Sequence, residues 1–342
     1  MSNKSLLITL DDDEVVEAQA PVIVSASRYT DIPAWYADWF LERLKQGYSI
    51  WRNPFNAKRS YVAYDNTRLI VFWSKNPEPL LKHGGCLDYL EERNINTYIH
   101  YTLNDYEGDG LEPNLPSLNE RIDTFKRLVD RLGFGKVIWR FDPMILTKRI
   151  GVEELMAKVE NIAHKLHGYT EKLVFSYADI KAVRGVRTTM KLSGVKAREI
   201  VEEDMHKIAL GLQSLNSAFG YQLAACSEHI DLSAYGISRN RCIDEDLIIR
   251  HFSHDRALME HLGVELSSGS LFDAGELSIK RKNNKDKQRR DVCGCIASKD
   301  IGQSDTCMYM CPYCFSNTRP SLAELNYMMH KDNPHRPTIN GK

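Results

Sequence analysis

The chain has 342 residues, of which 43% are hydrophobic and 27% are charged, the ordinary balance of a globular protein. Its formal net charge of −1 excludes a global field that would draw it to nucleic acid or to a membrane surface. No apolar run approaches the roughly 20 residues of a membrane-spanning helix, and the start of the chain turns acidic at residues 11–14, unlike a secretory signal. We therefore expect a cytoplasmic protein without a membrane partner.

Short apolar strands alternate with amphipathic helices from about residue 21 to residue 226. Continuous apolar runs, such as residues 69–73, are typical of strands buried on both faces. Apolar residues at helical spacing mark the segments between the strands. In chain order we predict strands at 22–25, 69–74, 97–103, 136–140, 172–177 and 221–226, a hairpin at 48–51 and 61–64, and helices at 33–47, up to about 93, 118–132, 152–166, 196–219, 244–250, 256–262 and 321–329.

This alternation predicts an α/β fold in which about six parallel strands are covered by helices. A (β/α)-type barrel, a partial barrel and an open doubly wound sheet all fit, because periodicity does not distinguish them. We expect the barrel-like body to span residues 21–230 after an N-terminal extension (1–20). A cysteine-rich, cluster-binding region (231–318) should complete the same domain, followed by a C-terminal helix and a polar, disordered tail (319–342).

Charged residues follow nearly every predicted strand. In parallel architectures the carboxyl ends of the strands build the active site, so these residues are candidates for one shared pocket. Arg140 and Asp142 could orient a carboxylate or phosphate of the substrate, since arginine binds such groups bidentately, or they could form a structural ion pair. Lys75 could contact an anionic group of a cofactor or substrate. The candidate catalytic residues are Arg28, Asp31, Lys75, Arg140, Asp142 and Glu228.

Five of the eight cysteines lie within 22 residues near the C-terminus. In a reducing cytosol such clustering indicates metal or redox chemistry more often than disulfides. Cys307, Cys311 and Cys314, called the loop cysteines below, could bind one compact site from a single loop. Thiolates suit iron–sulfur clusters and zinc. A structural zinc site takes four protein ligands, whereas three ligands leave one metal position open, as a reactive centre needs.

The C-x3-C-x2-C spacing, with an aromatic residue before the last cysteine, resembles the radical S-adenosylmethionine (radical SAM) superfamily. The resemblance implies that the loop cysteines hold a [4Fe–4S] cluster whose open iron binds S-adenosylmethionine, with Tyr313 against the adenine. The position of Lys75 after a buried strand would let it contact the carboxylate of S-adenosylmethionine or an anionic group of the substrate. The resemblance also implies a flavodoxin- or ferredoxin-type electron donor and a 5′-deoxyadenosyl radical that acts on an unknown substrate. In that superfamily the motif follows the first strand. Here it lies about 30 residues from the C-terminus, so the implied chain order is permuted.

The chain also resembles an uncharacterised bacterial domain-of-unknown-function family (1848), whose C-terminal cysteines are like those of radical SAM proteins. That resemblance spans nearly the whole chain and implies no substrate. The stretches that carry it are residues 25–33, 52–56, 72–77, 139–143 and 293–295.

Four further cysteines could form a second metal site, either an iron–sulfur cluster or zinc. Glycine between Cys293 and Cys295 permits the tight turn that lets both bind one metal. Cys226 and Cys242 would complete a set of four, here called the second cysteine group. Alternatively, Cys226 and Cys242 are small buried hydrophobic residues. Cys86 is expected to be unligated.

A different class of function uses the same residues. In a zinc- or cluster-stabilised nucleic-acid-binding protein, Cys293, Cys295, Cys311 and Cys314 would form a four-cysteine zinc knob. The basic run at residues 280–290 would then contact phosphates. The near-neutral net charge and the unused Cys307 disfavour this alternative.

Overall fold

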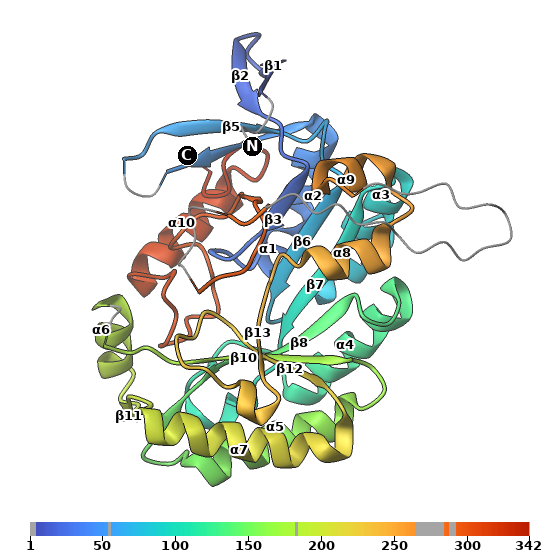
Figure 1. Cartoon of the computed structure of the whole chain (residues 1–342). Coiled ribbons are helices and arrows are strands. Elements are labelled where there is room, and N and C mark those ends of the chain that lie inside the picture. The colour runs from blue at the N-terminus through green and yellow to red at the C-terminus, as the bar shows by residue number, and fades with distance from the viewer. Residues whose placement is uncertain (1–4, 54–55, 182–183, 265–283, 287–291, 342) are drawn as a thin grey trace, which may run out of the picture.

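The computed structural model describes residues 5–53, 56–181, 184–264, 284–286 and 292–341. Its centre is a sheet of eight strands, and each neighbouring pair is parallel (Figure 1). The strands are Ile23–Ala26 (β3), Leu69–Ser74 (β6), Asn96–Thr102 (β7), Val137–Met144 (β8), Lys172–Tyr177 (β10), Gln222–Ala225 (β12), Ser238–Arg239 (β13) and Lys299–Asp300 (β14). Their order across the sheet is β13-β12-β10-β8-β7-β6-β3-β14.

Apart from β14, strands that are neighbours in the sheet also follow one another along the chain. This is the winding of a (β/α) barrel, in which right-handed crossovers place the connecting helices on one face. The edge strands β13 and β14 do not pair with each other among the described residues, so the sheet is open and a closed barrel is not found. The predicted parallel α/β body is confirmed, with eight strands in place of six.

The crossover helices cover one face of this sheet. They include Ala37–Gln46 (α2), Cys86–Glu92 (α3), Leu118–Leu132 (α4), Val152–Leu166 (α5) and Glu202–Phe219 (α7). Their apolar stripes pack in the larger core on strand residues such as Phe72, Tyr101 and Trp139, which are fully buried. A capping box between Ser117 and Glu120 begins α4 where the sequence predicts it.

Two predicted helices are shorter in the structure. The helix expected at 33–47 is broken at Tyr36 into Ile32–Trp35 (α1) and α2, because Tyr36 leaves the helical conformation. The helix expected from residue 196 begins only at Glu202, because Ala197–Arg198 (β11) pairs with Leu146–Thr147 (β9). The segment before it forms another helix, Arg184–Leu192 (α6), which was not predicted.

The opposite face of the sheet is covered by the chain that follows β13. Two short helices, Glu245–Phe252 (α8) and Arg256–Leu262 (α9), pack there on alternate strand residues such as Val71 and Ile138. Cys242 and Cys295 belong to this smaller core, and Cys226 and Cys293 pack against it. The second cysteine group therefore lies on the face of the sheet away from the crossover helices.

The two chain ends add a second sheet and a helix. Ser5–Thr9 (β1) and Val15–Gln19 (β2) join the confirmed hairpin of Tyr48–Arg52 (β4) and Arg59–Ala63 (β5), so the N-terminal extension is part of the fold. The last helix is Pro320–Asp332 (α10).

The prediction of a disordered tail is wrong. The indole N–H of Trp39 donates to the carbonyl of Arg336 at 2.8 Å, and the N–H of Ile50 donates to the carbonyl of Pro337 at 2.8 Å. Thr338 and Ile339 are buried. Polar composition indicated disorder, but the backbone of this tail is held by residues that precede it by almost 300 positions.

Candidate functional site

Strand β14 brings the end of the chain to the carboxyl edge of the parallel sheet. Lys299 and Asp300 pair in parallel with Val24 and Ser25 of β3. The Asp300 carboxylate then accepts hydrogen bonds from Ser25 Oγ (2.7 Å), Ser27 Oγ (2.7 Å) and the N–H of Arg28 (3.0 Å). The strand beside β3 therefore comes from the C-terminal part of the chain, immediately before the loop cysteines. Sequence reasoning missed Asp300, because a two-residue strand carries no periodic signal.

The loop after β14 is tied to the segment after β3. Thr30 Oγ1 lies 2.6 Å from Thr306 Oγ1 and donates to the carbonyl of Gln303 at 2.7 Å. The hydroxyl of Tyr36 donates to the carbonyl of Thr306 at 2.7 Å. These bonds fix the residue just before Cys307, so the loop cysteines begin from a defined position at the strand ends.

The three loop cysteines come from one short loop and are shielded from water, but their side chains do not converge at metal-binding distances. Cys311 is buried, Cys307 and Cys314 are half-buried, and all three are free thiols. The N–H of Cys314 donates to the carbonyl of Cys311 at 3.0 Å, closing a turn between them. Burial raises the pKa of Cys311 to about 12 and that of Cys307 well above its usual value. Burial thus favours the protonated thiols, and a bound metal would have to displace those protons.

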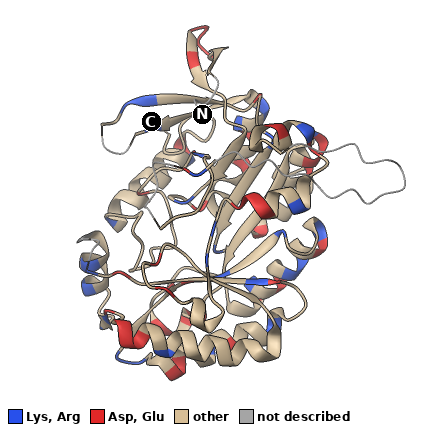
Figure 2. Cartoon of the chain, viewed as in Figure 1, with Lys and Arg blue, Asp and Glu red and all other residues tan. Residues whose placement is uncertain are grey.

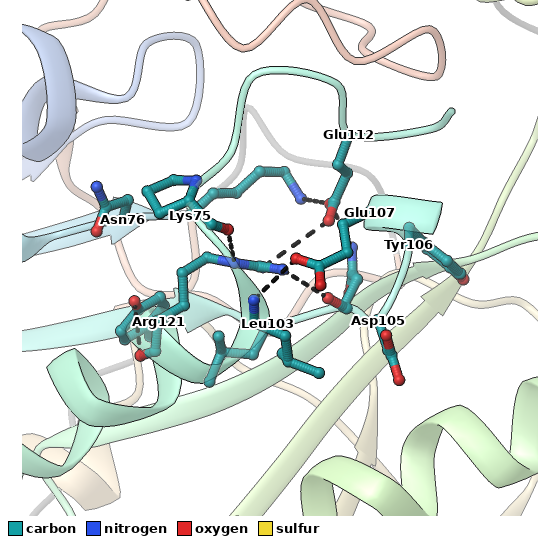
Figure 3. Close-up of polar contacts among 12 residues, drawn as sticks. Lys75, Asn76, Leu103, Asp105, Tyr106, Glu107, Glu112 and Arg121 are labelled. Carbon is teal, nitrogen blue, oxygen red and sulfur yellow. Dashed lines mark hydrogen bonds and ion pairs between the residues drawn. The ribbon is translucent and has the colours of Figure 1, made fainter. Parts of the chain in front are cut away.

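Tyr313 is anchored on a buried ionic network. Its hydroxyl donates to Glu112, which also accepts from Lys75 Nζ (2.7 Å) and Asn104 Nδ2 (3.0 Å). Arg121 NH1 lies 3.8 Å from the other oxygen of Glu112, and Figure 3 shows Lys75 and Arg121 both pointing toward that carboxylate. Burial alone would raise the pKa of Glu112, but the two cations outweigh it and hold this pKa below its usual range.

Lys75 and Tyr313, the two predicted cofactor-binding residues, therefore lie side by side, and their binding of a cofactor stays a prediction. Lys75 Nζ lies 5.2 Å from the centroid of the Tyr313 ring, and its charge is balanced by Glu112. Sequence reasoning missed Glu112 and Arg121. Both are polar residues outside the strand ends, and no local pattern marks them as buried.

Asp31 has a well-defined local role. Its carboxylate accepts from Ser74 Oγ (2.7 Å), from the N–H of Lys75 (2.7 Å) and from the N–H of Ala34 (3.1 Å), which caps α1. Burial raises the pKa of Asp31 to about 6, although these hydrogen bonds oppose the shift. The residue thus ties the end of β6 to the segment after β3, and its catalytic role stays a prediction.

Arg140 and Asp142 form the ion pair that the sequence left as one of two alternatives. The guanidinium of Arg140 pairs with Asp142, whose other oxygen accepts from Ser176. The N–H of Asp142 donates to Asn104 Oδ1 at 2.9 Å, which joins this pair to the Glu112 network. Arg140 NH1 also donates to Cys242 Sγ at 3.3 Å. A substrate-binding role for the pair stays a prediction.

The second cysteine group is gathered on the other side of Arg140. Cys226 Sγ lies 3.5 Å from Cys242 Sγ, and the N–H of Cys242 donates to Cys295 Sγ at 3.1 Å. The thiol of Cys293 in turn interacts with that of Cys295. Arg28 also lies near this group, since its charge interacts with Cys242, Cys295 and Cys293. Its Cζ packs over the ring of Trp73, 4.6 Å from the ring centroid.

Glu228 is the predicted residue that lies apart. It accepts from the N–H of Tyr177 at 2.9 Å and lines a cavity of about 240 Å³ with Asp231 and Arg239. A larger cavity of about 560 Å³ is also distant from the loop cysteines, since it is lined by Asp11, β4 and the C-terminal tail. None of the polar contacts described above joins either cavity to the loop cysteines.

Two findings bear on metal and nucleic acid. In the part of the chain that the structure describes, no three His, Cys, Asp or Glu side chains converge at metal-binding distances. The contacts of Cys295 go to the second cysteine group and those of Cys311 to Lys75 and Glu112, which disfavours a zinc knob shared between them.

Of the basic run at 280–290, all basic residues except Lys285 lie outside the described residues. Elsewhere acidic and basic residues are interspersed over the helices (Figure 2).

The fold and the site define an α/β protein whose eight-stranded, all-parallel sheet presents buried thiols and ion pairs at its carboxyl edge. Residues 23–316 match the model of the domain of unknown function DUF1848, and the chain belongs to that family. Part of the chain also aligns with a crystal structure from Bacteroides thetaiotaomicron VPI-5482 for which an alpha-L-fucosidase identity has been suggested. That similarity has 14% identity and a TM-score of 0.24, and it covers 49% of this chain and 64% of the other, too little to carry an argument.

No curated protein matches the chain. Among the described helices, none has the length and apolar character needed to cross a bilayer. The radical SAM resemblance and the cytoplasmic location therefore stay predictions.

Proposed function

We propose that this protein is an iron–sulfur enzyme of the radical SAM class, in which the loop cysteines hold a [4Fe–4S] cluster. The observation that carries the proposal is the position of β14. In the radical SAM pattern the cysteine loop follows the first strand of a parallel sheet, and here β14 supplies that strand beside β3 from the far end of the chain. The permuted order is thus compatible with the same arrangement in space.

The donor set fits such a cluster. Three soft sulfur ligands on one short loop, packed in and against the larger core, could offer three anchor points and leave the fourth position to a substrate or cosubstrate. When bound, the reduced cluster supplies the electron that cleaves S-adenosylmethionine into methionine and a 5′-deoxyadenosyl radical. The electron would come from a flavodoxin- or ferredoxin-type donor, and Phe315, which is 57% exposed next to Cys314, leaves that side of the loop accessible.

The surrounding residues would bind and orient the cosubstrate. Tyr313 presents an aromatic face whose position is fixed by its hydroxyl on Glu112. Lys75 lies beside that ring and can share its charge with the carboxylate of S-adenosylmethionine. Tyr106 and Leu103 are fully buried beside this part of the core, and such an apolar surrounding would keep water away from a reactive radical.

The test is anaerobic purification and reconstitution of the full chain, followed by incubation with dithionite and S-adenosylmethionine. We expect a brown protein with about four iron atoms per cluster site, which releases 5′-deoxyadenosine on reduction. The triple variant Cys307→Ala, Cys311→Ala, Cys314→Ala should lose this cluster and this product. Cys86→Ala is the matched control, because Cys86 is also buried but lies in α3, outside both groups.

Two results would contradict the proposal. One is a colourless preparation that contains zinc alone after full reconstitution. The other is a reduced, iron-loaded protein that forms no 5′-deoxyadenosine. A cluster that survives in the triple variant would show that the iron is held by other residues.

A further inference from the structure

We propose that the second cysteine group binds one tetrahedral metal ion of the zinc class, separate from the loop cysteines and independent of the radical chemistry. Its members come from three places in the chain. Cys226 directly follows β12, Cys242 directly precedes the segment into α8, and Cys293 and Cys295 precede β14. The fold brings these segments together on the face of the sheet that α8 and α9 cover.

The sulfur spacing favours a single ion over a cluster. The four thiols lie in a row in which Cys226 contacts Cys242, Cys242 contacts Cys295, and Cys295 contacts Cys293. The Cys226–Cys242 sulfur distance is 3.5 Å. A tetrahedral site with Zn–S bonds of about 2.3 Å separates its sulfurs by about 3.8 Å. A four-iron cubane holds its ligand sulfurs farther apart, because two Fe–S bonds and an edge of the cube lie between them.

The hydrogen bonds around the central sulfurs suit thiolates. Cys242 Sγ accepts from Asn240 Nδ2 at 3.2 Å and from Arg140 NH1 at 3.3 Å. Cys295 Sγ accepts from the N–H of Cys242 at 3.1 Å and from that of Ile243 at 3.5 Å. A protonated thiol is a weak acceptor, so four N–H donors directed at two sulfurs suit a pair of thiolates better than a pair of thiols. Metal binding is what keeps buried thiolates charged.

The charge of such a site would be compensated locally. One divalent ion with four thiolates leaves a net charge of −2, and the buried guanidinium groups of Arg140 and Arg28 flank it. Arg28 NH1 and NH2 are buried and have no hydrogen-bond acceptor within the described residues; the only ion pair there, to Asp300, spans 3.9 Å. An unsatisfied guanidinium in a core is costly, and a metal–thiolate centre beside it removes that cost.

Because no three of the described thiols, imidazoles or carboxylates converge at metal-binding distances, closing the row into a tetrahedron requires the end thiols, Cys226 and Cys293, to rotate toward the two central ones. Both are less buried than Cys242 and Cys295, which leaves them room to do so. The bound ion would then fasten the end of β12, the entry to α8 and the segment before β14 to each other. Since β14 leads into the loop cysteines, this site would support the strand that positions them.

The test is the metal content of the full-length triple variant Cys307→Ala, Cys311→Ala, Cys314→Ala, measured by mass spectrometry after purification from zinc-supplemented cells. We expect about one zinc ion per chain, falling to about zero when Cys242→Ser is added. Adding Cys86→Ser instead should leave the zinc in place. Cobalt substitution of the triple variant should give the intense visible bands of tetrahedral thiolate coordination.

If Cys242→Ser prevents folding, Cys293→Ser can replace it, because Cys293 lies at the half-buried end of the row. Adding Cys293→Ser to the triple variant should then weaken the visible bands of the cobalt-substituted protein. A triple variant that folds but holds no metal would overturn the proposal. So would a triple variant that holds about four iron atoms per chain, because the group would then carry a cluster. Failure of S-adenosylmethionine cleavage in the native protein would leave this result unaffected.

Discussion

Neutralising Glu112 tests the ionic network that fixes Tyr313. Glu112 and Arg121 are fully buried, and Lys75 is 17% exposed. The substitution Glu112→Gln keeps the shape of the side chain but leaves two buried cations without a counter-charge. Breaking a buried pair on one side costs about 3–5 kcal/mol. Because glutamine still accepts from Tyr313 and Lys75, we expect the lower end, a loss of about 3 kcal/mol in the free energy of unfolding.

The assay is urea denaturation of the metal-free protein, with unfolding monitored by both circular dichroism and tryptophan fluorescence. The control is Glu78→Gln, whose side chain is 52% exposed and pairs with Arg127 at 3.9 Å, so that its effect should stay within about 0.5 kcal/mol. Adding Lys75→Met to Glu112→Gln should restore part of the loss, with a coupling of about 1–3 kcal/mol. The reasoning is refuted if Glu112→Gln lowers the free energy of unfolding no more than Glu78→Gln does. It is also refuted if the effects of Glu112→Gln and Lys75→Met are additive, because the two residues would then not be coupled.

Two further predictions concern the junction with β14 and the tail. A Cβ at Gly302 would lie 1.8 Å from Ser27 Oγ, so Gly302→Ala should lower the free energy of unfolding by about 1–3 kcal/mol and weaken iron binding. The control is Gly108→Ala, because no heavy atom lies within 4 Å of a Cβ built at Gly108. It should change neither the thermal unfolding nor the iron content of the reconstituted protein. Burial lowers the pKa of His330 to about 4. The folded state therefore takes up its proton later than the unfolded state, and stability that is complete above about pH 6.5 should fall by up to about 3 kcal/mol as the pH drops to about 4. In urea titrations His330→Gln should flatten this slope, and exposed His83→Gln should not.

The regular part of the fold could be predicted because its signals are local. The apolar runs of β6 and β10 and the capped helix α4 have the predicted bounds, since each depends on residues within one element. What could not be predicted is nonlocal. Strands β13 and β14 are two residues long, and only their partners in the sheet define them.

The candidate site follows the same division. Cysteine spacing marked both cysteine groups, and strand ends marked Lys75 and Arg140. Glu112 is bonded to Lys75 across 37 positions and to Tyr313 across 201 positions, so nothing near it in the sequence indicates burial. Asp300 is likewise bonded to Ser27 across 273 positions. Buried polar networks of this kind are defined by the tertiary fold, and single-sequence patterns do not contain them.

A row of polar contacts along the carboxyl edge of the sheet leads from Tyr313, which lies between Cys311 and Cys314 in the sequence, to Cys242 of the second cysteine group. The side chain of Asn104 reaches the hydroxyl of Tyr313 at 3.4 Å and accepts from the N–H of Asp142 at 2.9 Å. Asp142 pairs with Arg140, whose NH1 donates to Cys242 Sγ at 3.3 Å. Because β7 and β8 are adjacent and parallel, these side chains lie in one layer at the carboxyl ends of the two strands. Cysteine variants of one group therefore have to be assayed for the metal content of both groups before a loss of activity is assigned to either.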